Sequence, residues 1–318
     1  MSDVLRTPDH RFANLPDFPW EPNYHSVSDA QHGQLRMHYL DVGPRDGDIV
    51  LMLHGEPSWC FLYRHMIHAL SARGLRCIAP DLVGFGRSDK PAARSAYSYA
   101  GHVAQVGELL RALEVNKVTL LCQDWGGPIG LSLLAQMPER FSAVVAANTL
   151  LPGCEPPPNG VAPWPGEIVE QWVAATRDAE DLDVSGVIAA VSCTPLSAGV
   201  LAAYDAPFPS PAYKAGALVF PSLIPTHAQM AGAAENRQTW EFLCHWEKPF
   251  VTAFSDSDPA TAAWGPVFQQ RIPGARGREH PTIMGAGHFL QEEQGDALAA
   301  VVARTVDSLR ATSSTVES

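Results

Sequence analysis

Apolar runs and amphipathic stretches alternate along the first half of the chain. Apolar runs rich in β-branched residues, which are typical of strands, cover residues 35–41, 49–54, 75–80, 117–123 and 143–148. Amphipathic stretches typical of helices cover residues 61–73 and 97–113. Strands that alternate with helices predict a largely parallel sheet flanked by helices, which is an α/β fold.

This alternation breaks in a proline-rich passage at residues 152–165. From there to about residue 220 the pattern is helical, without a clear strand run. Strand-like segments return at residues 249–255 and 280–284, and a final amphipathic helix covers residues 290–310. We therefore expect a core formed by residues 1–151 and 223–318, with residues 152–222 inserted as a helical cap.

The run at residues 117–123 ends abruptly in Asp124-Trp125-Gly126-Gly127, before a helical stretch at residues 128–137. A nucleophile elbow has this strand–turn–helix pattern, and it requires small residues two before and two after the nucleophile, where Cys122 and Gly126 stand. A carboxylate that attacks an alkyl carbon forms an ester that water can cleave, whereas a serine would form a stable ether. Asp124 therefore favours attack on saturated carbon, with helix capping as the alternative.

Two later turns supply a carboxylate and a histidine. The carboxyl ends of parallel strands meet at one edge of a sheet, so the residues that follow them gather there. Residues 255–259 offer Asp256 and Asp258. We favour Asp258 for its separation from the strand end, since Asp256 can form a turn. His288 follows the last strand-like run, so the chain order is nucleophile, acid, histidine. Because an aspartate is already ionised near neutral pH, His288 would activate water and Asp258 would orient its ring.

The turn after residues 49–54 contains Gly55-Glu56-Pro57. A glycine there lets the chain turn so that the backbone amide of Glu56 faces the nucleophile. Together with the amide of Trp125, it would form an oxyanion hole. An ordinary Gly-Pro turn is the alternative reading of these residues.

Two leaving groups fit an aspartate nucleophile: a halide ion, or the oxygen of a strained epoxide. An alkoxide needs an acid, typically a pair of tyrosines, whereas a halide needs only donors in a dry pocket. Trp125 and Trp172 can each offer an indole N–H, a donor without acceptor character, and therefore favour halide. Trp164 competes with Trp172 for this role, and Tyr204 and Tyr213 keep the epoxide alternative open. A non-catalytic binder that has kept the pocket is a third hypothesis.

Composition mainly excludes certain partners, locations and cofactors. The chain has 34 acidic and 22 basic residues and a formal net charge of -12, which opposes binding to nucleic acid or anionic membranes. We find neither a secretory signal nor an apolar run long enough to span a bilayer, and therefore expect a cytoplasmic protein. The 6 cysteines and 12 histidines lack metal-like spacing. We expect no metal, no cofactor, and a monomer or small homo-oligomer.

Four motifs together resemble the haloalkane dehalogenases of the α/β-hydrolase fold: HGEPSW at 54–59, PDLVGFGRSDKP at 80–91, QDWGG at 123–127 and AGHF at 286–289. Residues 6–12 and 206–209 are similar to the subfamily that binds halide between two tryptophans, which supports Trp125 and Trp172. Another subfamily has an asparagine halide donor and a catalytic acid where this chain has Glu56 and Asn148, so the acid is again expected at Asp258. The resemblance implies that water hydrolyses a small apolar haloalkane to alcohol, halide and a proton, without a cofactor.

Overall fold

The computed structural model describes residues 3–153 and 166–316, so Trp164 lies outside the described residues. Within these ranges, no helix is long and apolar enough to cross a membrane. The cytoplasmic location stays a prediction.

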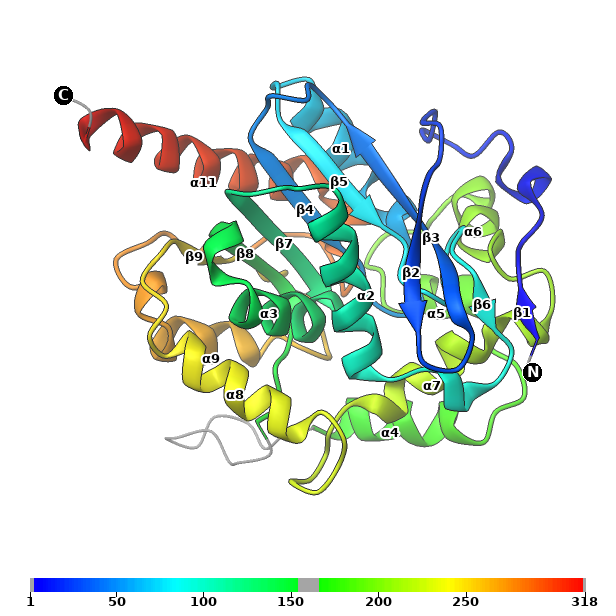
Figure 1. Ribbon diagram of the computed structural model, residues 1–318. Helices are drawn as coiled ribbons and strands as arrows, with labels where there is room; N and C mark the ends of the chain where they lie inside the picture. The colour runs from blue at the N-terminus through cyan, green and yellow to red at the C-terminus, as the bar shows by residue number, and fades with distance from the viewer. Residues whose placement is uncertain (1–2, 154–165, 317–318) are drawn as a thin grey trace.

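A seven-stranded sheet with the order β2-β3-β5-β4-β7-β8-β9 forms the centre of the molecule (Figure 1). Neighbours from β5 to β9 pair in parallel, whereas β2, β3 and β5 pair antiparallel, so the prediction of a mostly parallel sheet is confirmed. A separate short pair joins β1 to β6. The strands are β1 (Val4–Leu5), β2 (Asn23–Asp29), β3 (Gly33–Val42), β4 (Ile49–Leu53), β5 (Arg76–Pro80), β6 (Lys90–Pro91), β7 (Val118–Asp124), β8 (Phe141–Thr149) and β9 (Phe250–Thr252).

Helices cover both faces of this sheet (Figure 1). One layer contains α2, α3 and α8, and the other contains α1 and α11, which pack against each other. The apolar residues of β4, β5, β7 and β8 are buried between these layers, as expected for parallel strands. The core helices are α1 (Arg64–Ser71), α2 (Tyr99–Ala112), α3 (Gly126–Gln136), α8 (Ala233–Leu243), α9 (Trp264–Arg271), α10 (Leu290–Glu293) and α11 (Gly295–Val316). The 3₁₀ helices are η1 (Asp9–Phe12), η2 (Cys60–Tyr63), η3 (Arg94–Ala96), η4 (Pro138–Arg140), η5 (Pro211–Lys214) and η6 (Pro273–Ala275).

The described part of the cap is helical and contains no strand. Its four helices are α4 (Glu167–Arg177), α5 (Val184–Ala190), α6 (Ala198–Asp205) and α7 (Ala215–Leu223), and they pack in the pairs α4 with α7 and α5 with α6. Side-chain caps begin two of them: Asp183 accepts from the Gly186 amide, and Ser197 accepts from the Val200 amide. The exact cap boundaries stay a prediction.

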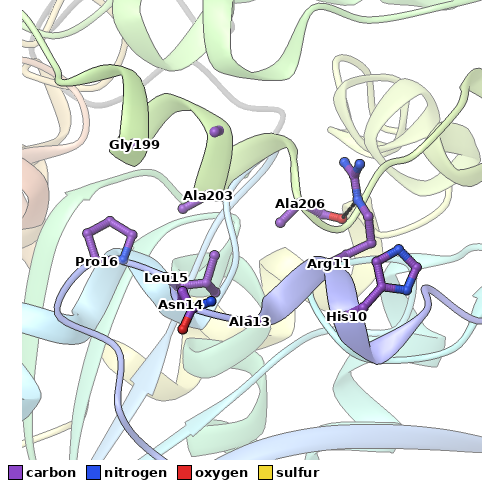
Figure 2. Close-up of a pocket in the computed structure, with 10 residues that line it drawn as sticks. His10, Arg11, Ala13, Asn14, Leu15, Pro16, Gly199, Ala203 and Ala206 are labelled. Atoms are coloured by element: carbon purple, nitrogen blue, oxygen red, sulfur yellow. Dashed lines mark hydrogen bonds between the residues drawn. The ribbon is translucent and has the colours of Figure 1, made fainter.

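The N-terminal segment contacts the cap at the end of helix α6. Arg11 donates to the carbonyl oxygens of Ala206 at 3.2 Å and Asp205 at 3.3 Å, at the C-terminal end of α6. A cation there satisfies carbonyl groups that the helix leaves unpaired. Figure 2 shows the groove between the two segments, with Leu15 and Ala203 among the residues that line it.

The strand expected at residues 280–284 is wrong, because this segment forms only an isolated bridge between Ser255 and Ile283. The His280 ring explains this: its Nδ1 accepts the amide of Thr252 at 3.1 Å, which a neighbouring strand would otherwise bind. Pro281, which has no amide hydrogen, follows directly. Helix α8 and strand β2 were not expected from the sequence.

Candidate active site

Asp124 occupies a crowded turn between β7 and α3. Its backbone is left-handed, with φ of 49°, a conformation that costs energy in a residue other than glycine. A Cβ atom on Gly126 would lie 2.0 Å from the Leu53 carbonyl oxygen, and one on Gly127 would lie 1.7 Å from Thr149 Oγ1. The turn can therefore form only with glycine at these two positions, and it lifts the Asp124 side chain above the edge of the sheet.

His288 lies between two carboxylates. Its Nδ1 is 3.0 Å from Asp258 Oδ1, and its Nε2 is 3.5 Å from Asp124 Oδ2. Asp258 is buried, and its second oxygen accepts hydrogen bonds from the amide and the hydroxyl group of Thr261. Asp256 instead accepts the amides of the turn that precedes His288, at 2.9 Å and 3.3 Å. The structure therefore brings Asp124, His288 and Asp258 together, and it places Asp256 in the turn.

The two carboxylates control the protonation of His288. Burial lowers the pKa of His288, but Asp258 and Asp124 outweigh it and raise this pKa to about 10. In return, His288 holds the pKa of Asp258 below its usual value, although burial alone would raise it. The triad is therefore an ion-paired chain in which the histidine carries a proton when both carboxylates are charged.

The turn after β4 approaches the nucleophile closely. The backbone amide of Glu56 donates to Asp124 Oδ1 at 2.9 Å. A Cβ atom on Gly55 would lie 2.2 Å from that same oxygen, so only glycine permits the approach. Trp125 is the N-cap residue of α3, and its buried ring lies edge-on against Tyr99 and Phe220. The Glu56 amide therefore contacts the Asp124 carboxylate, and Trp125 follows Asp124 in the chain with its ring packed in an aromatic cluster.

Trp172 reaches the site from the cap. It lies on α4, is partly buried, and donates its indole Nε1–H to the Glu56 carboxyl oxygen Oε2 at 3.1 Å. Arg94 supports the far end of this helix by donating to the carbonyl oxygens of Thr176 at 3.4 Å and Arg177 at 2.6 Å. It donates to the carbonyl of Ala179 as well. Side chains from two separate core segments therefore hold the helix that carries Trp172.

Several supporting residues were not predicted from the sequence. The Asn148 amide group donates to the carbonyl oxygens of Gly287 at 2.9 Å and His288 at 3.0 Å, and its Oδ1 accepts the amide of Ser255. Asn148 has a φ of 35°. An asparagine at the end of a buried strand was the available signal, because asparagine tolerates this conformation. The Gln123 amide nitrogen also lies 3.1 Å from His288 Nε2.

The two tyrosines considered for epoxide opening have different surroundings. The Tyr204 hydroxyl donates to Glu292 at 2.6 Å, and Glu292 in turn pairs with Arg64. This cluster is buried, and burial raises the pKa of Tyr204 well above its usual value. Tyr213 is partly buried in η5. The Tyr204 hydroxyl is therefore already bound to Glu292, and this hydrogen bond joins cap helix α6 to core helix α10.

Among the residues that the structure describes, one group of side chains could be considered for a metal ion: His38, Cys60 and Asp81. Asp81 already binds the other two residues, although His38 Nε2 is buried without a hydrogen-bond partner among the described residues. His38 Nδ1 lies 2.7 Å from Asp81 Oδ2, and the Cys60 backbone amide donates to Asp81 Oδ1 at 2.8 Å. All three side chains are buried, so the cluster serves to join β3, β5 and η2.

A carboxylate at a strand-to-helix elbow, with a buried histidine and acid at the same edge of a mostly parallel sheet, defines the class of α/β hydrolases. A family model described as the alpha/beta hydrolase fold matches residues 48–294. Haloalkane dehalogenases from two bacteria are similar over nearly the whole chain. The one from Psychrobacter cryohalolentis is 49% identical over 95% of this chain and 98% of its own length. The one from Mycolicibacterium paratuberculosis is 43% identical over 93% and 96%.

Solved structures agree with these relatives. A haloalkane dehalogenase from Paraglaciecola agarilytica, described as tetrameric, has a TM-score of 0.85 and 36% sequence identity, and the match covers 94% of this chain and 97% of that one. The chain belongs to the haloalkane dehalogenases, hydrolases that act on carbon–halide bonds.

Proposed function

We propose that Asp124 displaces halide from a haloalkane and that His288 then directs water onto the resulting ester. The observation that carries this proposal is the chain of contacts from Asp258 through His288 to Asp124, at 3.0 Å and 3.5 Å. Oδ1 of Asp124 accepts the Glu56 amide at 2.9 Å, so Oδ2 is the oxygen that attacks. The C–X bond breaks as the O–C bond forms, and the halide leaves with the bonding electrons.

Hydrolysis is the second step, and ester formation prepares His288 for it. The alkylated Asp124 has no charge, so one of the two carboxylates that raise the pKa of His288 is lost. With the Asp124 charge gone, the pKa of His288 falls, so the neutral imidazole that can accept a proton from water at Nε2 becomes available. Water attacks the ester carbonyl, and the amides of Glu56 and Trp125 stabilise the oxyanion. Alcohol leaves, the carboxylate is restored, and one proton is released.

The halide leaves between Trp125 and Trp172 in this proposal. Two observations support this: Trp125 directly follows the nucleophile in the chain, and the Trp172 indole N–H donates at 3.1 Å to the side chain of Glu56, whose backbone amide binds Asp124. An indole N–H donates without accepting, which suits an anion. The buried apolar surroundings of Trp125 favour a small apolar substrate.

Release of bromide from a panel of short bromoalkanes tests this function, with Asp124→Ala as the inactive control. We expect halide release by the unchanged protein and none by the variant, with the fold of both checked by circular dichroism. If no substrate yields bromide, the proposed function is wrong. If Asp124→Ala still turns substrate over, the nucleophile is a different residue. Because the Tyr204 hydroxyl is bound to Glu292, we expect an aliphatic epoxide assayed in parallel to stay intact.

We propose that the enzyme acts as a monomer or a small homo-oligomer. The Paraglaciecola relative described as tetrameric is the support for an assembled form. Light scattering on the eluting protein will determine the mass directly.

A further inference from the structure

The side chain of Glu56 takes no chemical part in the reaction proposed above; it only accepts the Trp172 indole N–H, while the backbone amide serves the nucleophile. It is nevertheless 5% exposed, beside the nucleophile and within the catalytic site. Its Oε2 accepts the Trp172 indole N–H at 3.1 Å. Its Oε1 is buried and has no hydrogen-bond partner among the described residues. A buried carboxyl group with a single donor requires an explanation, because unsatisfied polar groups are costly in a protein interior.

The single donor on Trp172 creates a competition. An indole ring has one N–H group, and the structure directs it to Glu56. When Trp172 donates to a halide ion, the Glu56 carboxyl group loses this hydrogen bond. An ionised Glu56 would then lie without a donor beside a second anion, in a site that already contains Asp124. A neutral carboxylic acid avoids this repulsion, and it also adds an O–H donor to the site.

We propose that Glu56 is a further residue of the halide site and is a neutral acid whenever Trp172 donates to the halide. This inference rests on the proposed Trp125 and Trp172 halide site. One halide ion enters together with one proton, so the charge of the site is unchanged. When the halide leaves, Glu56 releases the proton and again accepts the Trp172 N–H.

The groups around Glu56 favour this behaviour. The charged groups that act on it are Asp124, from the elbow, and His288, from its own turn. Burial raises the pKa of Glu56 well above its usual value, and Asp124 raises it further, whereas the Trp172 hydrogen bond and His288 lower it. Loss of the Trp172 hydrogen bond would remove one of the two influences that stabilise the ionised form.

Bromide titrations followed by tryptophan fluorescence, from about pH 6 to about pH 9, test the linkage in the complete protein. We expect bromide affinity to fall by up to about tenfold per pH unit as pH rises, the limit for uptake of one proton. Glu56→Gln keeps the backbone amide and is permanently neutral. Its bromide affinity should therefore vary much less with pH, and at high pH it should exceed that of the unchanged protein.

His288 is the other group that could supply the proton, so His288→Gln is titrated in parallel. If Glu56→Gln keeps the full pH dependence and His288→Gln loses it, the linkage belongs to His288 and the inference is overturned. Calorimetry in two buffers of different ionisation enthalpy counts the protons taken up per bromide without any variant. An uptake of zero across this pH range would also overturn it. A Trp172→Phe variant with unchanged bromide affinity would instead disprove the halide site itself.

Discussion

The two halves of the active site are held in place by different means. Asp124, Asp258 and His288 lie on core turns, and Asn148 ties two of those turns together through backbone carbonyl and amide groups. Trp172 lies on a cap helix that contacts the core through long side chains, those of Arg94 and Glu56. The positions of the reacting groups are therefore set by backbone contacts, whereas the position of the proposed halide donor, Trp172, is set by contacts of side chains.

Because of this difference, the geometry of the reacting groups and the halide affinity should respond differently to substitution. Turns that are packed into the core cannot shift without a large rearrangement of the backbone. The relative positions of the nucleophile, base and acid are therefore set by the fold itself. A helix held by a few side chains can shift with a single substitution, so halide affinity can change without loss of the fold. We therefore expect core substitutions to stop the reaction and cap substitutions to adjust it.

The largest effect is expected for His288→Gln. The ester should still form, because Asp124 needs no base, but its hydrolysis should stop. We expect one equivalent of halide in a burst, followed by turnover more than about 10⁴-fold slower, as for the loss of a catalytic base in other hydrolases. Rapid-mixing halide detection and intact-protein mass measure the burst and the trapped alkyl group. Continuous turnover at the original rate would contradict the assignment of the base.

Asp258→Asn should come next, at about 10³-fold to about 10⁴-fold. An asparagine cannot stabilise the imidazolium, and it favours the wrong ring tautomer at Nδ1, which lies 3.0 Å from Asp258. Asp256→Asn is the matched control, because it changes the neighbouring carboxylate, which accepts the amides of the turn before His288. Its steady-state turnover should stay close to that of the unchanged protein. A larger loss for Asp256→Asn than for Asp258→Asn would reverse the two roles.

The core half of the site could be predicted from sequence because its residues lie at or soon after apolar runs. Asp124 ends β7 and Asp258 follows β9, and parallel strands bring such positions together. His288 follows a run that forms only an isolated bridge to Ser255, but this bridge brings it to the same edge of the sheet. Their supports were harder to predict. The Asn148 side chain binds turns more than 100 residues away along the chain, and no local pattern indicates those partners.

The contacts that position the cap side of the site, around Trp172, were much harder to predict from sequence. Its indole and the resemblance to the dehalogenase subfamily indicate Trp172, but no local pattern pairs it with the Glu56 side chain. That contact joins residues 116 positions apart, and Arg94 binds α4 across more than 80. Helix periodicity predicts which face of a cap helix is apolar, but not which core side chains hold its ends.

Trp172→Phe should have an intermediate effect. It removes one charge-assisted hydrogen bond to the halide, which is worth about 1.5–3 kcal/mol, so bromide affinity should fall by about tenfold or more. Chlorinated substrates should lose more of their rate than iodinated ones, since chloride is the poorer leaving group. Fluorescence titration and substrate series measure the two effects. Trp20→Phe, in the N-terminal segment, is the matched control for the loss of one tryptophan signal. Equal losses for chloride and iodide would argue against stabilisation of the leaving group.

Arg94→Met should have the smallest effect, and it tests the cap directly. Methionine keeps much of the apolar stem but removes the donors to the Arg177 and Ala179 carbonyl groups at the end of α4. The helix should then hold Trp172 less firmly. The loss of about 1 kcal/mol for such a contact corresponds to a roughly fivefold weaker bromide affinity.

Single-turnover ester hydrolysis should be nearly unchanged in Arg94→Met, because His288 and Asp258 are held by the core. Arg111→Met, on the exposed face of α2, is the matched control and should alter neither property. Slower hydrolysis with unchanged bromide affinity in Arg94→Met would contradict the separation between the two halves. A loss confined to halide binding would place control of halide affinity in the side chains that hold the cap, because the reacting groups would then be independent of them.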